Sequence, residues 1–200
     1  MQRMLKEIRI AGFGGQGVIL AAAVIGKAEA IFQGGYACMT QSFGPEARGG
    51  SSSAQVILSS DPILYPYVTQ PDILVVMSQE AYTRFSPQLK PGGILITEQE
   101  LVRIDKVPAG VKMYGVPATR LAEEIGKKVV LNIVMVGFFG AVTNLLEPDS
   151  LRQAVADSVP PAMQALNLKA FDKGFAYGAE LIERMKENGD SVDVGVLEAV

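Results

Sequence analysis

A glycine-rich turn near the start of the chain is the first segment whose residue types could do chemistry. Gly12, Gly14 and Gly17 fit the spacing G-x-G-x-x-G, with Gly15 and Gln16 between them. Glycines allow a tight turn and a close approach of the backbone to a ligand, and the first N–H groups of a following helix form an anion site. The turn therefore predicts either a phosphate-binding site or a purely structural strand-to-helix turn.

The expected partner of a dinucleotide-binding turn is missing. Such a site needs an acidic residue about 20 positions further on, to bind a ribose. Counting from Gly17 leads to Ala37 and Cys38, and residues 36–45 contain neither Asp nor Glu. The missing acid argues against free NAD(P) and leaves a bound phosphate open. A free-standing NAD(P)-binding oxidoreductase with a Rossmann-like domain remains an alternative class of protein.

A second polar, glycine-rich segment spans residues 41–53. Its candidate binding residues are Ser42, Gly44, Pro45, Glu46, Arg48, Gly49 and Gly50. Ligands and partners of open α/β sheets dock beyond the carboxyl ends of strands, and an arginine can clamp a phosphate or a carboxylate with its planar donors. The plainer interpretation is a surface ion pair between Glu46 and Arg48, which contributes only about 0–1 kcal/mol. We favour a binding role, towards a small molecule or another chain.

Composition excludes several kinds of site. The 200 residues carry a net charge of −3, no histidine and a single cysteine, Cys38. His-dependent triads, His-ligated metals, an internal disulfide and an iron–sulfur cluster, which needs about four thiolates, are therefore excluded. We assign no catalytic residue and no metal ligand. Redox chemistry must come from a cofactor or from another chain.

Composition also bears on partners and location. An acidic chain without a basic cluster is a poor binder of nucleic acid. The charged first residues lack the apolar stretch of a signal peptide. The most apolar segment, residues 129–146, is interrupted by Asn132 and falls short of the about 20 residues that a membrane span needs. With a single thiol, the chain is expected in the cytoplasm and away from membranes.

Short apolar runs alternate with helical segments along the chain. We predict strands within residues 7–12, 36–40, 54–58, 71–78, 94–97 and 111–116, and helices within 18–32, 79–85, 120–126, 129–146, 148–158 and 165–188. This order is typical of a three-layer α/β/α domain with a mostly parallel sheet and a helical C-terminal region. The domain is expected to span residues 1–188, with a tail over 189–200. Ser78 and Thr119 are predicted helix caps, and Asn132 either a helix cap or a buried amide satisfied by the backbone.

Four motifs together resemble the gamma subunit of 2-oxoacid:ferredoxin oxidoreductases. They are GFGGQGV from Gly12, TQSFGPEARGGS from Thr40, DILVVMSQEA from Asp72 and NIVMVG from Asn132. They occur in this order, and the resemblance covers about residues 5 to 185 as one pyruvate/ketoisovalerate oxidoreductase gamma-type domain. Residues 61–85 are most similar to chains of 2-oxoglutarate enzymes (2-oxoglutarate synthases), while pyruvate, branched-chain 2-oxoacid and indolepyruvate enzymes share the main motifs.

The resemblance implies an activity that resides in a complex. Such enzymes convert a 2-oxoacid, coenzyme A and oxidised ferredoxin to an acyl-CoA, CO2 and reduced ferredoxin; from 2-oxoglutarate the product is succinyl-CoA. Thiamine diphosphate, Mg and the iron–sulfur clusters are expected on partners, namely alpha and beta subunits and an optional ferredoxin-like delta subunit. This chain alone is expected to be inactive.

The resemblance also implies roles for the two glycine-rich segments. We expect them to lie close together at the carboxyl edge of the sheet, where they contact either coenzyme A phosphates or the thiamine-binding chain. Phe43 stands where relatives often have tyrosine, so one hydroxyl donor is absent there. A ligand-free interaction module, in which both segments are interface, stays open.

Overall fold

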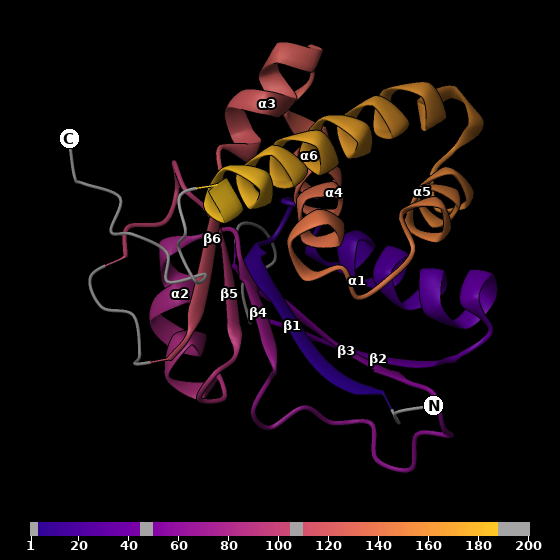
Figure 1. Cartoon of the computed structure of the whole chain (residues 1–200), viewed down its shortest axis with the longest axis vertical. Coiled ribbons are helices and arrows are strands. Elements are labelled where there is room, and N and C mark those ends of the chain that lie inside the picture. The colour runs from indigo at the N-terminus through magenta and orange to yellow at the C-terminus, as the bar shows by residue number, and fades with distance from the viewer. Residues whose placement is uncertain (1–3, 45–49, 105–109, 188–200) are drawn as a thin grey trace.

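The sheet of this protein has six strands in the order β2–β3–β1–β4–β5–β6 (Figure 1). The computed structural model describes residues 4–44, 50–104 and 110–187. The strands are β1 (Leu5–Phe13), β2 (Tyr36–Phe43), β3 (Ser51–Ser59), β4 (Ile73–Val76), β5 (Ile94–Glu98) and β6 (Lys112–Val116). Sequence periodicity therefore located every strand, although β2 and β3 extend further into the polar segment than expected.

One strand runs antiparallel to its neighbours. β1, β4, β5 and β6 pair in parallel, whereas β3 is antiparallel to both β1 and β2. Residues 44–50 join β2 to β3, and a parallel connection would need a crossover of about a dozen residues. A hairpin is the arrangement that so short a connection allows. The other five strands point the same way, so the sheet is mixed but mostly parallel.

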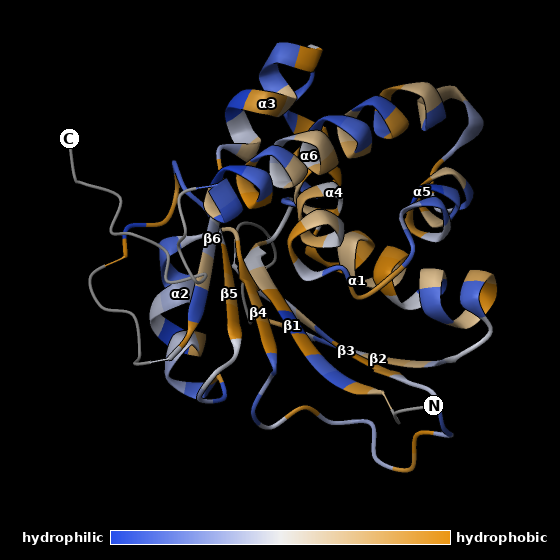
Figure 2. Cartoon of the chain, in the orientation of Figure 1, coloured by the Kyte–Doolittle hydropathy of each residue, from blue (hydrophilic) through white to orange (hydrophobic). Residues whose placement is uncertain are grey.

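Helices cover both faces of this sheet, which confirms the three-layer prediction. They are α1 (Val18–Lys27), α2 (Gln79–Phe85), α3 (Ala118–Ile125), α4 (Leu131–Thr143), α5 (Pro148–Asp157) and α6 (Pro161–Glu187). Ile8 and Ile10 of β1 point into the core beneath α1 and α4. Leu74 and Val76 of β4 point to the other face, where α2 packs. Strand β4 is buried on both faces, and Figure 2 shows it mostly in orange.

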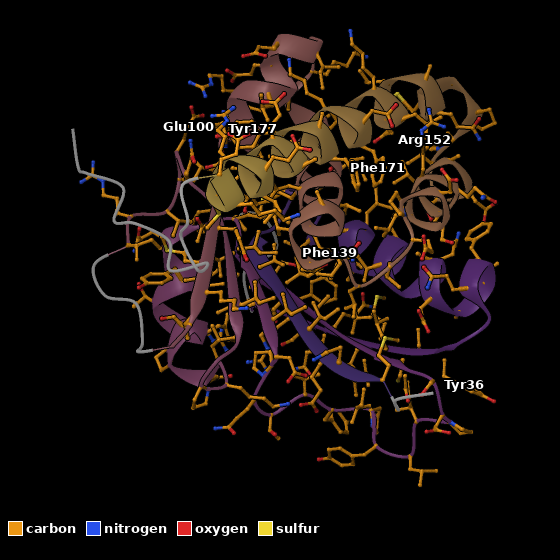
Figure 3. All side chains as sticks on the ribbon, in the orientation of Figure 1. Tyr36, Glu100, Phe139, Arg152, Phe171 and Tyr177 are labelled. Atoms are coloured by element: carbon orange, nitrogen blue, oxygen red, sulfur yellow. The ribbon has the colours of Figure 1, made fainter. Side chains whose placement is uncertain are left out.

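The outer helical layer is joined to the sheet through α4. This helix is apolar and buried over nearly its whole length, and α6 crosses it (Figure 3). A Cβ atom added at Gly174 of α6 would lie 2.0 Å from the carbonyl oxygen of Val134 in α4. The two helices therefore meet backbone to backbone, with Phe139 and Phe171 buried in the core beside the crossing.

Several predicted helix boundaries move in the structure. The segment predicted as one helix over 18–32 is α1 followed by a π-helical stretch, η1 (Ala28–Gln33). The segment 129–146 begins with a 3₁₀ turn, η3 (Lys128–Val130), and α4 ends at Thr143 because Asn144 is left-handed. α6 begins earlier than expected, at Pro161. The predicted tail over 189–200 lies outside the described residues.

The predicted caps had different outcomes. Ser78 caps α2 as expected, because its hydroxyl accepts a hydrogen bond from the N–H of Ala81 at 3.2 Å. The cap at Thr119 is wrong, since the N–H of Thr119 instead donates to the carboxylate of Glu98 at 2.9 Å. Glu98 is wholly buried and also accepts from the N–H groups of Glu100 and Leu101. A distant carboxylate therefore satisfies the first turn of α3.

Candidate functional site

The glycine-rich turn lies where β1 ends and α1 begins, at the carboxyl edge of the parallel strands. Gly12 is the penultimate residue of β1, and the exposed Gly14 and Gly15 form the turn itself. Gly17 is the N-cap of α1 and has no side chain to accept from the first N–H groups of the helix. Such a helix start can accommodate an anion.

The side chain of Gln16 stabilises this turn by two hydrogen bonds to the backbone. Its side-chain oxygen accepts from the N–H of Phe13 at 2.7 Å, and its amide nitrogen donates to the carbonyl of Met77 at 2.9 Å. Met77 directly follows β4, so the side chain links the ends of two neighbouring parallel strands. In this structure the Gln16 amide is used for positioning the turn.

Gly17 is fixed by a residue that the turn motif does not contain. The amide of Asn132, near the start of α4, donates to the carbonyl of Gly17 at 3.2 Å. Asn132 is only 2% exposed and the N-cap of α4 is Val130, so of the two predicted roles the structure shows the buried amide satisfied by the backbone. The fourth sequence motif thus supports the first, because α4 packs behind the glycine turn.

A backbone hydrogen bond brings the two glycine-rich segments together. The N–H of Gly14 donates to the carbonyl of Gly50 at 2.8 Å, and the N–H of Gly44 donates to the carbonyl of Ser51 at 2.7 Å. Ser42 is exposed near the end of β2. Both segments therefore share the carboxyl edge of the sheet. The remaining candidates, Pro45, Glu46, Arg48 and Gly49, lie outside the described residues, and a binding role for all of the candidates stays a prediction.

Arg84 is a cation at this edge that the motifs did not reveal. It lies on α2, is exposed, and donates to the hydroxyl of Ser51 at 3.3 Å. Within residues 4–44, 50–104 and 110–187 no carboxylate forms an ion pair with it. Its position next to Gly50 depends on the packing of α2 against β1, and short-range sequence patterns carry no signal for that contact.

The electrostatic environment of Arg84 includes a second, buried arginine. Arg9 and Arg84 both lie over the ring of Phe85, at 4.8 and 5.1 Å from its centre. Arg9 donates to the side chain of Gln88 and, at 2.9 Å, to the carbonyl of Val68. Burial lowers the pKa of Arg9 from its usual value, and the charge of Arg84 lowers it further. Two positive charges therefore lie close to one ring on the α2 face of the sheet.

Gln79, which follows the cap residue Ser78, has a structural role. The side chain of Gln79 makes two hydrogen bonds to the backbone of Arg103, at 2.7 and 3.2 Å. It ties the start of α2 to the segment after β5. Glu80 is exposed on the same helix.

Sheet topology bears on the dinucleotide alternative. A dinucleotide-binding fold places the second parallel strand of the β1–α1–β2 unit beside the first, so that the acid at its end reaches the ribose. Here the antiparallel strand β3 lies between β1 and β2. The end of β2, where such an acid would stand, is therefore one strand further from β1 than in a dinucleotide-binding fold. This displacement argues against the dinucleotide alternative, as does the missing acid.

Two further observations concern residues 4–44, 50–104 and 110–187. No group of three or more His, Cys, Asp or Glu residues among these residues could hold a metal ion. Within the same residues, no helix is both long enough and apolar enough to cross a bilayer.

The fold and the site together define an α/β domain with two glycine-rich segments that meet at the carboxyl edge of a mixed sheet. The family model described as pyruvate ferredoxin/flavodoxin oxidoreductase matches residues 7–177. The chain belongs to this family, as its four motifs indicated.

Three curated relatives match the chain over most of their length. The 2-oxoglutarate synthase subunit KorC of Methanocaldococcus jannaschii is 46% identical over 90% of this chain and 97% of the relative. The KorC subunit of Methanothermobacter thermautotrophicus is 47% identical over 87% of this chain and 95% of the relative. The pyruvate synthase subunit PorC of that same organism is 32% identical over 91% of this chain and 98% of the relative.

Solved structures share the fold. A keto/oxoacid ferredoxin oxidoreductase gamma subunit from Geobacter sulfurreducens superposes with a TM-score of 0.79 at 37% identity, over 88% of this chain and 98% of that chain. A 2-oxoglutarate:ferredoxin oxidoreductase from Magnetococcus marinus, solved with 2-oxoglutarate, coenzyme A and succinyl-CoA bound, gives 0.76 at 27% identity. The match covers 88% of this chain and 31% of that longer chain.

Proposed function

We propose that this chain is the gamma-type subunit of a 2-oxoglutarate:ferredoxin oxidoreductase. The complex would convert 2-oxoglutarate, coenzyme A and oxidised ferredoxin to succinyl-CoA, CO2 and reduced ferredoxin. Its place is inside the cell, where ferredoxin is available. This chain contributes to the coenzyme A side of the complex and to assembly, and the bond-making chemistry belongs to its partners.

The observation that carries the choice of substrate is a comparison within one organism. In Methanothermobacter thermautotrophicus the KorC subunit is 47% identical to this chain over 180 residues and the PorC subunit 32% over 186 residues. The greater similarity to KorC supports 2-oxoglutarate over pyruvate.

The cofactors of such an enzyme fit partner chains better than this one. An iron–sulfur cluster needs about four thiolates, and this chain has one cysteine. Thiamine diphosphate supplies the carbanion chemistry of 2-oxoacid decarboxylation. We therefore assign it, with Mg and the clusters, to alpha and beta subunits and to a ferredoxin-like subunit where one is present.

Coenzyme A fits the edge that the two glycine-rich segments share. Its phosphates need backbone N–H donors, which the start of α1 offers, and a cation, which Arg84 offers beside Ser51 in the neighbouring segment. Arg48 belongs to the same segment as Gly50, whose carbonyl accepts from Gly14. The proposal is that these groups hold the phosphate end of coenzyme A. The partner chains would then surround its other end, where the thiol of coenzyme A receives the acyl group.

The first experiment is an affinity purification of this chain from anaerobic native extract. We expect larger chains, thiamine diphosphate and iron–sulfur absorbance to co-elute, and a viologen dye to be reduced with 2-oxoglutarate and coenzyme A. Pyruvate, branched-chain 2-oxoacids and indolepyruvate, tested in parallel, identify the substrate. A colourless chain that elutes alone contradicts the proposal.

The coenzyme A contact has its own test in the assembled enzyme. Arg48→Ala is expected to raise the apparent KM for coenzyme A roughly tenfold, because a charge-assisted hydrogen bond to phosphate is lost. Subunit stoichiometry is measured on the same preparation. If neither the affinity for coenzyme A nor the stoichiometry changes, the segment has no such role.

A further inference from the structure

Strand β2 forms one open edge of the sheet. In the part of the chain that the structure describes, β2 pairs with β3 on one side only. Figure 1 shows it at the end of the sheet away from α2, and Tyr36, labelled in Figure 3, marks its start. An edge strand presents unpaired N–H and C=O groups to any strand that can reach them.

This edge lacks the features that normally protect it. The eight residues of β2, YACMTQSF, include no charged residue and no proline. Met39 and Phe43 are 38% and 65% exposed, and both are apolar. The opposite edge, β6, has only five residues and begins with a lysine. Proteins usually guard an exposed edge with charges, prolines or short strands, and β2 has none of these.

The hairpin register shows which backbone groups of β2 are free. Gly44 donates to Ser51, and the ladder continues from there by pairs such as Ser42 with Ser53 and Thr40 with Gln55. In an antiparallel ladder, hydrogen-bonded pairs alternate with pairs whose N–H and C=O groups point away. The free groups therefore belong to the residues between these pairs, which are Ala37, Met39, Gln41 and Phe43.

We infer that β2 pairs antiparallel with β2 of a second copy of this chain, around a two-fold axis at Thr40. In this register all four free residues form hydrogen-bonded pairs, Ala37 with Phe43 and Met39 with Gln41 of the other copy. Both sheets then join into one, with their corresponding faces on the same side.

The composition of β2 favours a copy of itself as the occupant. The small side chain of Ala37 comes to lie opposite the large ring of Phe43, and Thr40 lies opposite Thr40. No like charges meet, because the strand has no charge. η1, which packs beside β2, adds Ile31, whose side chain is 67% exposed. This association overlaps the second glycine-rich segment at residues 41–43 and leaves the start of α1 untouched. Its failure is distinguishable from that of the proposed contact with coenzyme A, because the readout is dimerisation of the full chain and not the KM for coenzyme A.

The register makes a cross-linking test specific. Thr40 would face its counterpart in a non-hydrogen-bonded pair, where the Cα atoms are about 4.5 Å apart and within reach of a disulfide. Thr40→Cys in a Cys38→Ser background is therefore expected to form a disulfide-linked dimer of the full chain under mild oxidation. The wild-type chain should not cross-link, since Cys38 lies opposite Ser42 in this register.

A matched variant checks the same register independently. Ser42→Cys, with native Cys38 retained, should link the two strands through Cys38 of one copy and position 42 of the other. Cross-linking of wild-type Cys38 to itself, or no cross-linking of either variant, would overturn the register. Linkage of position 40 to a different chain in the purified complex would assign this edge to a partner subunit and overturn the inference.

A charge placed on the edge tests the association without cysteines. Met39→Lys is expected to raise the dimer dissociation constant of the full chain at least tenfold in light scattering or sedimentation, because the introduced lysines of the two copies lie diagonally opposite each other. Adding Gln41→Glu should restore the dimer, since each introduced lysine then faces a glutamate across the pair. Circular dichroism verifies that both variants fold. A wild-type chain that is monomeric at all concentrations overturns the inference.

Discussion

The buried amide of Asn132 donates to the carbonyl of Gly17, which joins the start of α4 to the turn that begins α1. The two residues are also in close contact, because a Cβ atom at Gly17 would lie 2.4 Å from the amide nitrogen of Asn132. Gly17 has a φ of +72°, in the left-handed region. The turn is therefore held by conformation and by packing from a helix that is distant in the sequence.

Gly17→Ala tests this double constraint. We expect it to lower the free energy of unfolding by about 3 kcal/mol, from left-handed strain and from the clash with Asn132. The matched control is Gly34→Ala, whose φ is +76° but whose Cβ would meet no atom within 4 Å. The control should lose only about 1 kcal/mol. Urea unfolding measures both, and equal losses would remove the packing argument.

The buried carboxylate of Glu98 gives a second prediction. It accepts three backbone N–H groups, from Glu100, Leu101 and Thr119. Glu98→Ala leaves these donors without a partner, so we expect a loss of about 3 kcal/mol in the free energy of unfolding. Glu98→Gln keeps an acceptor and should lose less. Glu123→Ala at an exposed position of α3 serves as the control and should stay within about 0.5 kcal/mol; a similar loss there would contradict the capping role.

Lys90 is expected to make the free energy of unfolding fall at alkaline pH. Its ammonium bridges the carboxylates of Glu7 and Asp72 at 2.6 and 3.0 Å. Burial alone lowers the pKa of Lys90, but the hydrogen bonds and charges of Glu7 and Asp72 outweigh it and leave the pKa raised. The stabilisation is therefore complete below the unfolded pKa of about 10.4 and is lost as pH rises through the higher folded value.

The expected effect of this bridge is small, since water screens a partly exposed pair. Wild-type protein should lose up to about 1 kcal/mol of unfolding free energy between about pH 9 and about pH 11.5 relative to Lys90→Met. Chemical unfolding at the two pH values measures the difference. Parallel curves for the two proteins would show that the bridge contributes nothing.

Arg84 is expected to contribute to the binding of coenzyme A and not to the stability of the fold. In the assembled enzyme, Arg84→Ala should raise the KM for coenzyme A roughly tenfold and leave kcat unchanged, because one cation beside the glycine segments is removed. Arg152→Ala is the control, since it removes an exposed arginine that pairs with Asp172 on the outer helices. An unchanged KM for the Arg84 variant, or an equal change in the control, would exclude Arg84 from the site.

Local sequence patterns determined most of the elements of this protein. Alternating and continuous apolar runs located all six strands, and the hydroxyl of Ser78 marked the start of α2, because these signals act between residues close in the chain. The four motifs identified the family. Composition excluded histidine chemistry before any fold was considered.

Only the tertiary structure decided how these elements meet. The reversal of β3, the hydrogen bond from Gly14 to Gly50, the cap that Glu98 provides for α3 and the position of Arg84 beside Ser51 all join residues distant in the sequence. Each depends on strand order and helix packing, which collective burial of apolar surface selects. Local propensity does not encode such contacts. The two glycine-rich segments could therefore be recognised in the sequence, but only the fold shows that they lie together at one edge of the sheet.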